Sequence, residues 1–281
     1  MSDTTAFIFA HYSPRGGVSR SFRGLVAEAR RRSKIVKLIS TGLEISSNDQ
    51  LYNLADVVRR DNFGYDFWSY RIGVLDVIGN MDVERLVLIN SSFVAFDAKR
   101  LFDSLLQPID VPRIRGLTLS HDFSKHAQSY LLSIEGKALI QSPEFNDWWS
   151  SMVPISDRNE VIQRYEIGLS RSFEALGIPI TSVYQPSNRE NLIAISRAVG
   201  SLKCPIGDFF ADKFTINLDF SKTLNPTHFL WDFIFQRFLI FKTELVKSNP
   251  TEQCLDRLIT VLQERKEWME ITQEVLNLSN D

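Results

Sequence analysis

Cysteine is nearly missing from this chain of 281 residues, which holds only Cys204 and Cys254. The two have no metal-ligand spacing, and such low cysteine usage favours a reducing compartment. The N-terminus lacks the basic start and apolar run of a signal peptide. The longest apolar stretch, residues 229–241, is interrupted by Asp232 and Arg237, so it cannot form a membrane-spanning helix. We therefore expect a cytoplasmic, soluble protein, with peripheral contact at the inner membrane left open.

Several motifs of nucleotide and hydrolytic chemistry are also missing. The chain has no Gly-x-x-x-x-Gly-Lys-Ser/Thr loop, no Gly-x-Gly-x-x-Gly after a predicted strand and no Gly-x-Ser-x-Gly. A P-loop nucleotidase and a dinucleotide site are therefore not expected, and neither is a serine nucleophile elbow. The absence of His-x-x-x-His and Cys-x-x-Cys argues against structural zinc. What remains is Asp, Glu, His, Asn and Ser at several predicted strand ends, which suits group transfer by positioning and a carboxylate base.

Excess charge of either sign is absent as well. The formal net charge is −2, so bulk charge does not predict a nucleic-acid partner. The charge is uneven, however, because residues 1–40 hold eight Lys or Arg against Asp3 and Glu28. This basic segment could meet a diphosphate or an anionic membrane surface, but we favour a solvated helix surface.

Predicted strands and helices alternate along the chain. The strands are residues 6–10, 35–39, 57–58, 85–89, 115–120 and 129–134, and the helices are residues 18–32, 67–78, 98–105, 143–152 and 160–176. This alternation is typical of an α/β fold with a mostly parallel sheet. Ligands of such sheets bind beyond the carboxyl ends of the strands, where the loops 11–17, 40–44 and 90–92 are expected.

Length and composition suit one large α/β domain or one domain with an appendage, since 44% of the residues are hydrophobic and 23% are charged. We place the domain at residues 1–245 and the appendage at residues 246–281. Leucine and other apolar residues between 252 and 278 recur at near-helical spacing, which predicts an amphipathic helix. Its polar face carries more acid than base, so packing on the domain or on the partner of a homodimer is favoured over membrane binding.

The decapeptide Asn62–Arg71, Asn-Phe-Gly-Tyr-Asp-Phe-Trp-Ser-Tyr-Arg, is the most informative segment. Its aromatic rings offer flat apolar faces, Asp66 suits ribose or sugar hydroxyls, and Gly64 permits close approach of the backbone. These features point to a sugar or nucleotide ligand, with Asn62 and Arg71 beside it. The alternative is a capped helix start in an aromatic core, in which Asp66 has a capping duty.

Five blocks of the sequence, in order between about residues 6 and 247, resemble the rhamnan synthesis F family of bacterial glycosyltransferases. They are Asn62-x-Gly-Tyr-Asp-Phe-x-Ser-Tyr-Arg71-x-Gly73, Leu88-Ile-Asn-Ser-Ser92, Gly116-Leu-Thr118 with His126-x-Gln-Ser-Tyr130, Val161-Ile-x-x-Tyr-Glu-Ile-Gly-Leu-Ser170, and Asn225-Pro-Thr-His228 with Trp231 and Phe241-Lys-x-Glu-Leu245. The resemblance implies a GT-A-like, Rossmann-type α/β sandwich that binds a nucleotide-sugar donor, followed here by the C-terminal helical appendage.

The resemblance also implies where the donor binds. Many GT-A enzymes hold a divalent cation with an acidic motif after a central strand, and Asn90, Ser91 and Ser92 stand at that place. Ser91 replaces the acid of the family, and a hydroxyl is a poor ligand for Mg²⁺ or Mn²⁺. We therefore predict no metal ligands and leave the cofactor unknown. Cationic side chains or backbone N–H groups would then stabilise the leaving diphosphate, with Arg15, Arg20 and Arg71 as the candidate side chains. His11 follows the first strand and either contacts the nucleotide or caps a turn.

Inverting transfer requires a carboxylate that deprotonates the acceptor hydroxyl. Glu166 is the predicted base, because its surroundings resemble the block that carries the base in other inverting GT-A enzymes. The alternatives are a glutamate on the helix surface and a salt bridge with Arg164 or Arg171. The predicted acceptor-binding residues are Asp122, His126, Gln128 and Trp149.

From this resemblance we expect a glycosyltransferase that moves a deoxyhexose such as L-rhamnose to a growing bacterial surface polysaccharide, namely O-antigen, capsule or rhamnan. The expected acceptor is a saccharide or a lipid-linked glycan. Two alternatives remain open: a non-catalytic sugar-binding or scaffold subunit of a polysaccharide assembly complex, and a transferase of the same fold with another nucleotide-sugar.

Overall fold

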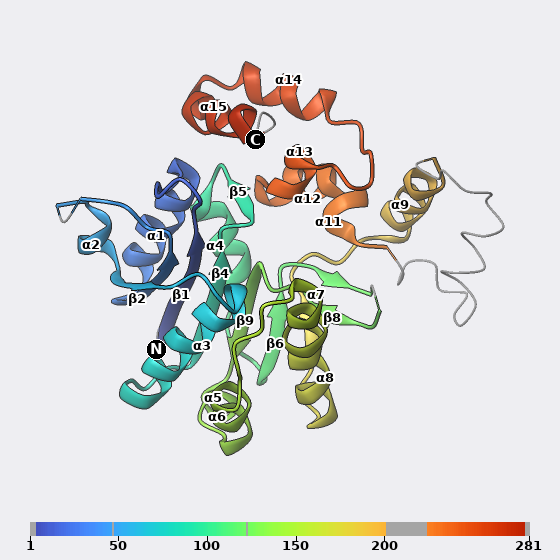
Figure 1. Cartoon of the computed structure of the whole chain (residues 1–281). Coiled ribbons are helices and arrows are strands. Elements are labelled where there is room, and N and C mark those ends of the chain that lie inside the picture. The colour runs from blue at the N-terminus through green and yellow to red at the C-terminus, as the bar shows by residue number, and fades with distance from the viewer. Residues whose placement is uncertain (1–3, 47, 122, 201–223, 279–281) are drawn as a thin grey trace.

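The computed structural model describes residues 4–46, 48–121, 123–200 and 224–278. Asp122 and Cys204 lie outside the described residues. A seven-stranded sheet forms the centre, in the order β10-β6-β9-β4-β1-β2-β3 (Figure 1). Its strands are β1 (Thr5–Tyr12), β2 (Ile35–Thr41), β3 (Asp56–Arg60), β4 (Arg85–Asn90), β6 (Arg113–Gly116), β9 (Leu131–Glu135) and β10 (Ile180–Ser182).

Most neighbouring strands of this sheet are parallel. β3, β2, β1 and β4 form one parallel set, β10 is parallel to β6, and β9 runs antiparallel to both β4 and β6. β1 is buried on both faces, as a near-continuous apolar run predicts for a central parallel strand. The expected α/β fold class is therefore confirmed: the chain forms a sandwich of helices around a mostly parallel central sheet.

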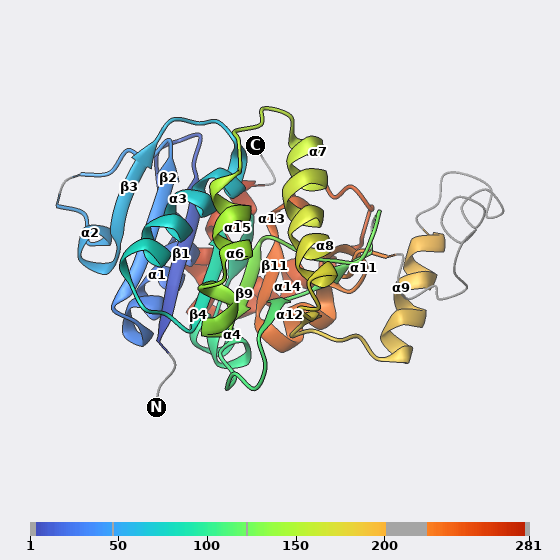
Figure 2. The ribbon, with the colours of Figure 1, turned by 90° about the horizontal axis from the view of Figure 1, so that it is seen from below.

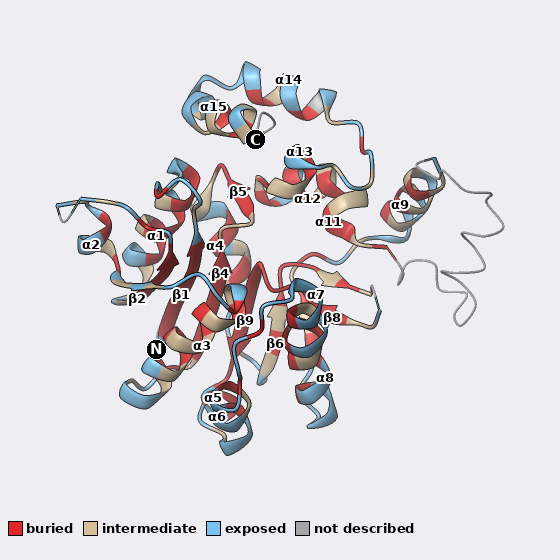
Figure 3. Ribbon diagram, viewed as in Figure 1, coloured by how far each residue is buried: buried red, intermediate tan, exposed pale blue. Residues whose placement is uncertain are grey.

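Helices cover both faces of the sheet and create two cores. On one face, α1 (Arg20–Arg32) and α4 (Ala98–Leu105) pack against alternate residues of β1 such as Phe7 and Phe9. On the other face, α3 (Tyr65–Asn80), α6 (Pro143–Ser150) and α8 (Gly168–Ala175) pack against Ile8 and its neighbours. Figure 2 shows α3 and α6 in front of the sheet, and Figure 3 shows the buried strands between these layers.

Shorter elements complete the described chain. They are α2 (Leu51–Leu54), β5 (Phe93–Ala95), β7 (Leu119–Ser120), β8 (His126–Ala127), α5 (Lys137–Ile140), α7 (Arg158–Val161), a π-helical turn η1 (Ile162–Ile167), α9 (Asn188–Gly200), α11 (Pro226–Phe229), α12 (Trp231–Phe238), β11 (Ile240–Lys242) and α13 (Thr243–Lys247). β7 pairs with β8, and β11 pairs with β5. The predicted strand 115–120 is thus divided between β6 and β7.

The C-terminal segment differs from the single helix that the sequence predicts. It forms α14 (Asp256–Glu264) and α15 (Met269–Leu278), joined by a 3₁₀ turn, η3 (Lys266–Trp268). Both helices pack on the domain through an apolar cluster that contains Leu258, Leu262 and Val275. Within the described ranges, no helix is long and apolar enough to cross a membrane.

Candidate active site

Asn90 ends β4, and its side chain is hydrogen-bonded to the start of α3. Its amide Nδ2 donates to Asp66 Oδ2 at 2.6 Å, and its Oδ1 accepts from the backbone N and the hydroxyl of Ser92 at 3.0 and 2.6 Å. Asp66 Oδ1 also accepts from Phe67 N. These bonds bring together Asp66, Asn90 and Ser92, three of the predicted donor-binding residues, at the edge of the sheet where α/β proteins bind ligands.

Gly64 sets the position of Asp66 by its backbone conformation. It precedes α3 with φ +70°, and an added Cβ would lie 2.7 Å from Trp68 Cβ. Glycine is therefore required here by the turn and by packing. Arg60 supports the same loop, because its guanidinium donates to the backbone oxygens of Phe63 and Tyr65. Asn62 lies exposed in this loop.

Lys242 is the site residue that sequence reasoning missed. Its Nζ donates to Ser92 Oγ at 2.9 Å and lies 4.6 Å from the centre of the Tyr130 ring. Burial lowers the pKa of Lys242, while Glu166, Glu244 and Asp66 favour its charged form. Lys242 belongs to the segment Phe241-Lys-x-Glu-Leu245, which resembles the family, but the resemblance implies no role for this lysine.

Glu166 lies at the same edge, on the π-helical turn η1. Its Oε1 accepts from Ser129 N at 2.8 Å, and the carbonyl of Ser129 accepts from Tyr70 OH at 2.9 Å. Burial raises the pKa of Glu166, and Asp66 adds to the increase, while the Ser129 N–H, His126 and Lys242 oppose it. The Glu166 side chain is half-buried, and the backbone N–H of Ser129 holds its carboxylate in place.

The alternative of a surface salt bridge is not supported for Glu166, since Arg164 instead lies 3.9 Å from Glu160. π-helical turns often occur at functional sites, and this one interrupts a helix that the sequence predicts to be regular over residues 160–176.

His126 and Gln128 border the same region and are both buried. His126 lies close enough to Glu166 to lower its pKa. Gln128 Oε1 accepts from Thr118 Oγ1 at 2.7 Å, and the same hydroxyl lies 2.9 Å from Tyr130 OH. Of the predicted acceptor residues, His126 therefore lies near the predicted base, and Gln128 is linked through Thr118 to Tyr130, whose ring lies beside Lys242.

His11 and Ser91 stabilise the strand ends themselves. His11 is buried, with Nδ1 2.7 Å from Ser40 Oγ, and burial together with the charge of Arg23 lowers its pKa to about 4. The imidazole is therefore neutral at physiological pH. Ser91 Oγ accepts from Tyr12 N at 3.2 Å and lies 3.4 Å from Tyr12 O, so it links the ends of β1 and β4.

The three arginines considered for the site are not brought into this cluster. The Arg71 guanidinium donates to Ser150 O at 3.2 Å and lies 4.7 Å from the centre of the Trp68 ring, at the contact between α3 and α6. Arg15 is exposed in the loop after β1. Arg20, also considered for the diphosphate, pairs with Glu270 of α15 at 2.6 Å.

Trp149 requires a correction. Its side chain is 0% exposed and stacks on Phe67 within the core formed by α3 and α6. A ring without exposed surface cannot stack on an acceptor sugar. Trp149 instead packs in the core, which is the commoner role of aromatic pairs such as Trp148-Trp149.

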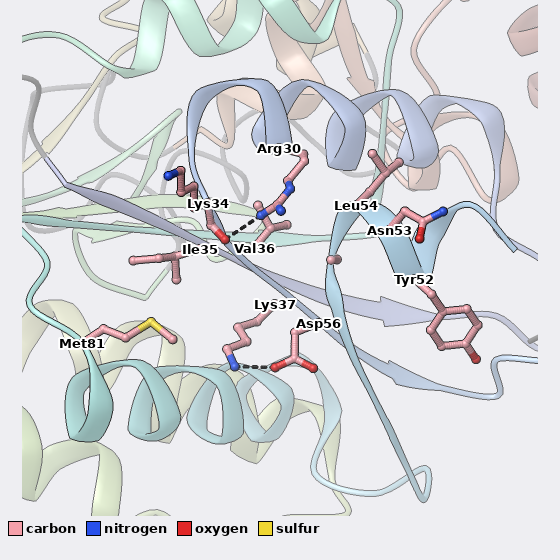
Figure 4. A pocket seen from close by; sticks show the side chains of 11 residues that line it. Arg30, Lys34, Ile35, Val36, Lys37, Tyr52, Asn53, Leu54, Asp56 and Met81 are labelled. Carbon is pink, nitrogen blue, oxygen red and sulfur yellow. Dashed lines mark hydrogen bonds and ion pairs between the residues drawn. The ribbon is translucent and has the colours of Figure 1, made fainter. Parts of the chain in front are cut away.

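A cavity of about 340 Å³ opens at the opposite edge of the sheet (Figure 4). It is lined by the first residues of β2 and by Arg30, Tyr52 and Met81. Lys37 lies there with its Nζ 2.5 Å from both Asp56 and Asp76. The cavity is therefore separate from the cluster around Asp66 and Glu166, which lies at the carboxyl ends of β1 and β4.

Comparison with solved structures gives distant similarities. The glycosyltransferase GlyE of Streptococcus pneumoniae is 12% identical, with a TM-score of 0.43 over 98% of this chain and 63% of its own. A cytidylyltransferase of Leptospira borgpetersenii is also 12% identical, with a TM-score of 0.34 over 79% of this chain and 98% of its own. Similarities at this level give no information about function.

Comparison of sequences is more informative. Virulence protein VirA of Vibrio anguillarum is 29% identical over 226 residues, which cover 77% of this chain and 70% of that protein. The uncharacterized protein y4gN of Sinorhizobium fredii is 28% identical over 138 residues, or 47% of this chain and 36% of its own. The family model described as rhamnan synthesis protein F matches residues 36–198, more than half of the chain. This chain therefore belongs to the rhamnan synthesis protein F family.

Proposed function

We propose that this protein is a glycosyltransferase that moves a sugar from a nucleotide-sugar to a saccharide or lipid-linked glycan. The observation that carries the proposal is one cluster at the carboxyl edge of the sheet, in which Glu166 lies beside the hydrogen-bonded chain Asp66–Asn90–Ser92–Lys242. Membership of a family named for rhamnan synthesis supports a deoxyhexose such as L-rhamnose as the sugar and a bacterial surface polysaccharide as the product.

In this proposal Glu166 is the general base. The acceptor hydroxyl attacks the anomeric carbon while Glu166 takes its proton, and the nucleoside diphosphate leaves from the opposite face, which inverts the configuration. Burial raises the pKa of Glu166 and makes its carboxylate a stronger base than an exposed glutamate. His126 and Gln128, which border Glu166, would bind the acceptor.

The donor would lie on the other side of the cluster. Asp66 Oδ2 and Oδ1 are already oriented by Asn90 and by the backbone of α3, and such preorganised acceptors suit sugar or ribose hydroxyls. Contact with a membrane surface and dimerisation stay predictions from the sequence.

The proposal is tested with a panel of nucleotide-sugars. A donor at about 1,000 times its dissociation constant stabilises the protein by roughly 4 kcal/mol, so the true donor should raise the melting temperature by several degrees. The stabilising compound is then incubated with the protein, and hydrolysis or transfer is measured by release of the nucleoside diphosphate. Binding with neither reaction would favour a non-catalytic sugar-binding subunit, and no binding at all would reject the proposal.

The substitution Asp66→Asn should weaken donor binding about ten- to a hundredfold, because a hydrogen bond to a charged group contributes about 1.5–3 kcal/mol. The shape of the side chain is preserved, so the fold should persist. Isothermal titration with the donor identified above measures the effect. Asp61→Asn is the matched control, since Asp61 is exposed in the same loop. Equal donor affinity in the wild type and Asp66→Asn would remove Asp66 from the site.

A further inference from the structure

The polar groups after β4 do not fit the divalent cation that a GT-A-like fold implies. Ser91 stands where the family has an acid, and its hydroxyl is engaged with the backbone of Tyr12. The amide oxygen of Asn90 is engaged with Ser92. Among the described residues, no three His, Cys, Asp or Glu side chains are grouped so that they could hold a metal ion. Magnesium prefers carboxylate ligands, which this loop does not supply.

An ammonium group stands next to this loop instead. Lys242 Nζ lies 2.9 Å from Ser92 Oγ, the third residue of the Asn90-Ser91-Ser92 sequence. A cation fixed at this distance would repel a second, divalent cation. Lys242 therefore supplies positive charge at the position where enzymes of this fold family bind a metal ion.

The backbone holds Lys242 in this position. β11 pairs antiparallel with β5 so that Lys242 lies opposite Phe93, the residue after Ser92. Thr243 adds two bonds, because its N and its Oγ1 both donate to Ser92 O at 3.0 Å. The pairing of β11 with β5 and the two Thr243 bonds thus fix the backbone of Lys242 beside this loop.

Three carboxylates, those of Glu166, Glu244 and Asp66, favour the charged form of Lys242, but each of them also has other partners. Glu244 is the acid closest in sequence, but its carboxylate lies 3.6 Å from His228 Nε2 and 3.9 Å from Arg158. Asp66 and Glu166 face Lys242 as well, and both have other hydrogen-bond donors. An ammonium has three donors, and one of them is directed at Ser92 Oγ, which leaves donors for an anionic ligand.

We propose that the ammonium of Lys242, and not a divalent cation, binds the diphosphate of the donor. This inference rests on the proposed function. When the bond between the anomeric carbon and the phosphate oxygen breaks, its electron pair passes to that oxygen, the acceptor oxygen bonds to the carbon, and the acceptor proton passes to Glu166. Lys242 donates hydrogen bonds to the growing negative charge and transfers no proton.

The test compares diphosphate binding with nucleoside binding in EDTA. UDP, dTDP, GDP, CDP and ADP are titrated calorimetrically into wild-type protein in EDTA, and again with Mg²⁺ or Mn²⁺ in its place. The diphosphate that binds most tightly and its parent nucleoside are then titrated into Lys242→Met and Lys242→Arg. Lys247→Met is the matched control, because Lys247 is exposed at the end of α13. Circular dichroism establishes that each variant is folded.

We expect wild type to bind the diphosphate equally well in EDTA and in metal. Lys242→Met should bind it about ten- to a hundredfold more weakly and bind the nucleoside unchanged, while Lys242→Arg keeps part of the affinity and Lys247→Met keeps all of it. Unchanged diphosphate affinity in a folded Lys242→Met would overturn the inference. Binding that requires Mg²⁺ or Mn²⁺ would overturn it too, while leaving the proposed function intact. If no diphosphate or nucleotide-sugar binds under any of these conditions, both are wrong.

Discussion

Glu166→Gln is expected to lower turnover about 10²–10⁴-fold, because a positioned general base contributes a factor of this size. The variant keeps the size of the side chain and an oxygen that can accept from Ser129 N, but it loses basicity. The donor dissociation constant should change little, since the base faces the acceptor. Single-turnover transfer and donor titration measured on the same protein separate the two effects.

The stability of Glu166→Gln has an expected sign of its own. Burial raises the pKa of Glu166, so the folded protein binds this proton more tightly than the unfolded chain does. Its stabilising contribution is present below the pKa of the unfolded chain and is lost as the pH rises through the raised pKa. Glutamine carries no charge, so Glu166→Gln should be more stable than wild type at pH 7.5. The difference should disappear at about pH 4, where Glu166 is protonated in both the folded and the unfolded protein.

Urea unfolding at both pH values measures this difference. A structural glutamate would give the opposite pair of results, namely lower stability at pH 7.5 and normal turnover. Normal turnover would make Asp122 the next acid to test as the base.

Glu135→Ala is expected to reduce the free energy of unfolding by about 3–5 kcal/mol, which is the usual cost of removing one partner from a buried ion pair. Glu135 is 0% exposed, and its carboxylate lies 2.7 Å from Arg113, 2.8 Å from Arg115 and 3.7 Å from Arg85. Without it, three guanidinium groups from β4 and β6 face one another at the end of β9.

Chemical denaturation measures the loss, and Glu267→Ala is the control. Glu267 pairs with Arg265 at 3.3 Å with both side chains more than half exposed, so its loss should cost less than about 1 kcal/mol. Glu135 lies at the edge of the sheet opposite the candidate site, so any folded Glu135→Ala protein should bind donor normally. Equal stability of the two variants would show that the buried cluster contributes no more than a surface pair.

The sequence predicted the central elements well, for a physical reason. β1, β2 and β4 are buried on both faces and therefore appear as continuous apolar runs. α1 and α6 each begin after a capping serine, Ser19 and Ser142, which marks their starts in the sequence. The short strands β5 and β11 carry no such signal, because three residues show no period and their pairing joins segments far apart in the chain.

The site was predicted in part for the same reason. Asp66, Asn90 and Ser92 follow a recognisable strand or begin a recognisable helix, so their meeting at one edge follows from the fold class. Lys242 reaches that edge only through the pairing of β11 with β5. Trp149 was misplaced because an aromatic pair on a helix has the same spacing whether it faces a ligand or a core.

Glu166 lies on a π-helical turn, and the extra residue of that turn determines which side chain of the helix points toward the site. A π turn holds one residue more than an α turn, so it is equivalent to a single-residue insertion in a regular helix. Removing one residue between Ile162 and Ile167 would restore the regular spiral and leave α7 and α8 in nearly the same orientation, because the extra residue is accommodated within the turn itself. Activity and fold are thus separable by one residue: a relative with a regular helix here could keep the whole sandwich and present a different side chain to the acceptor.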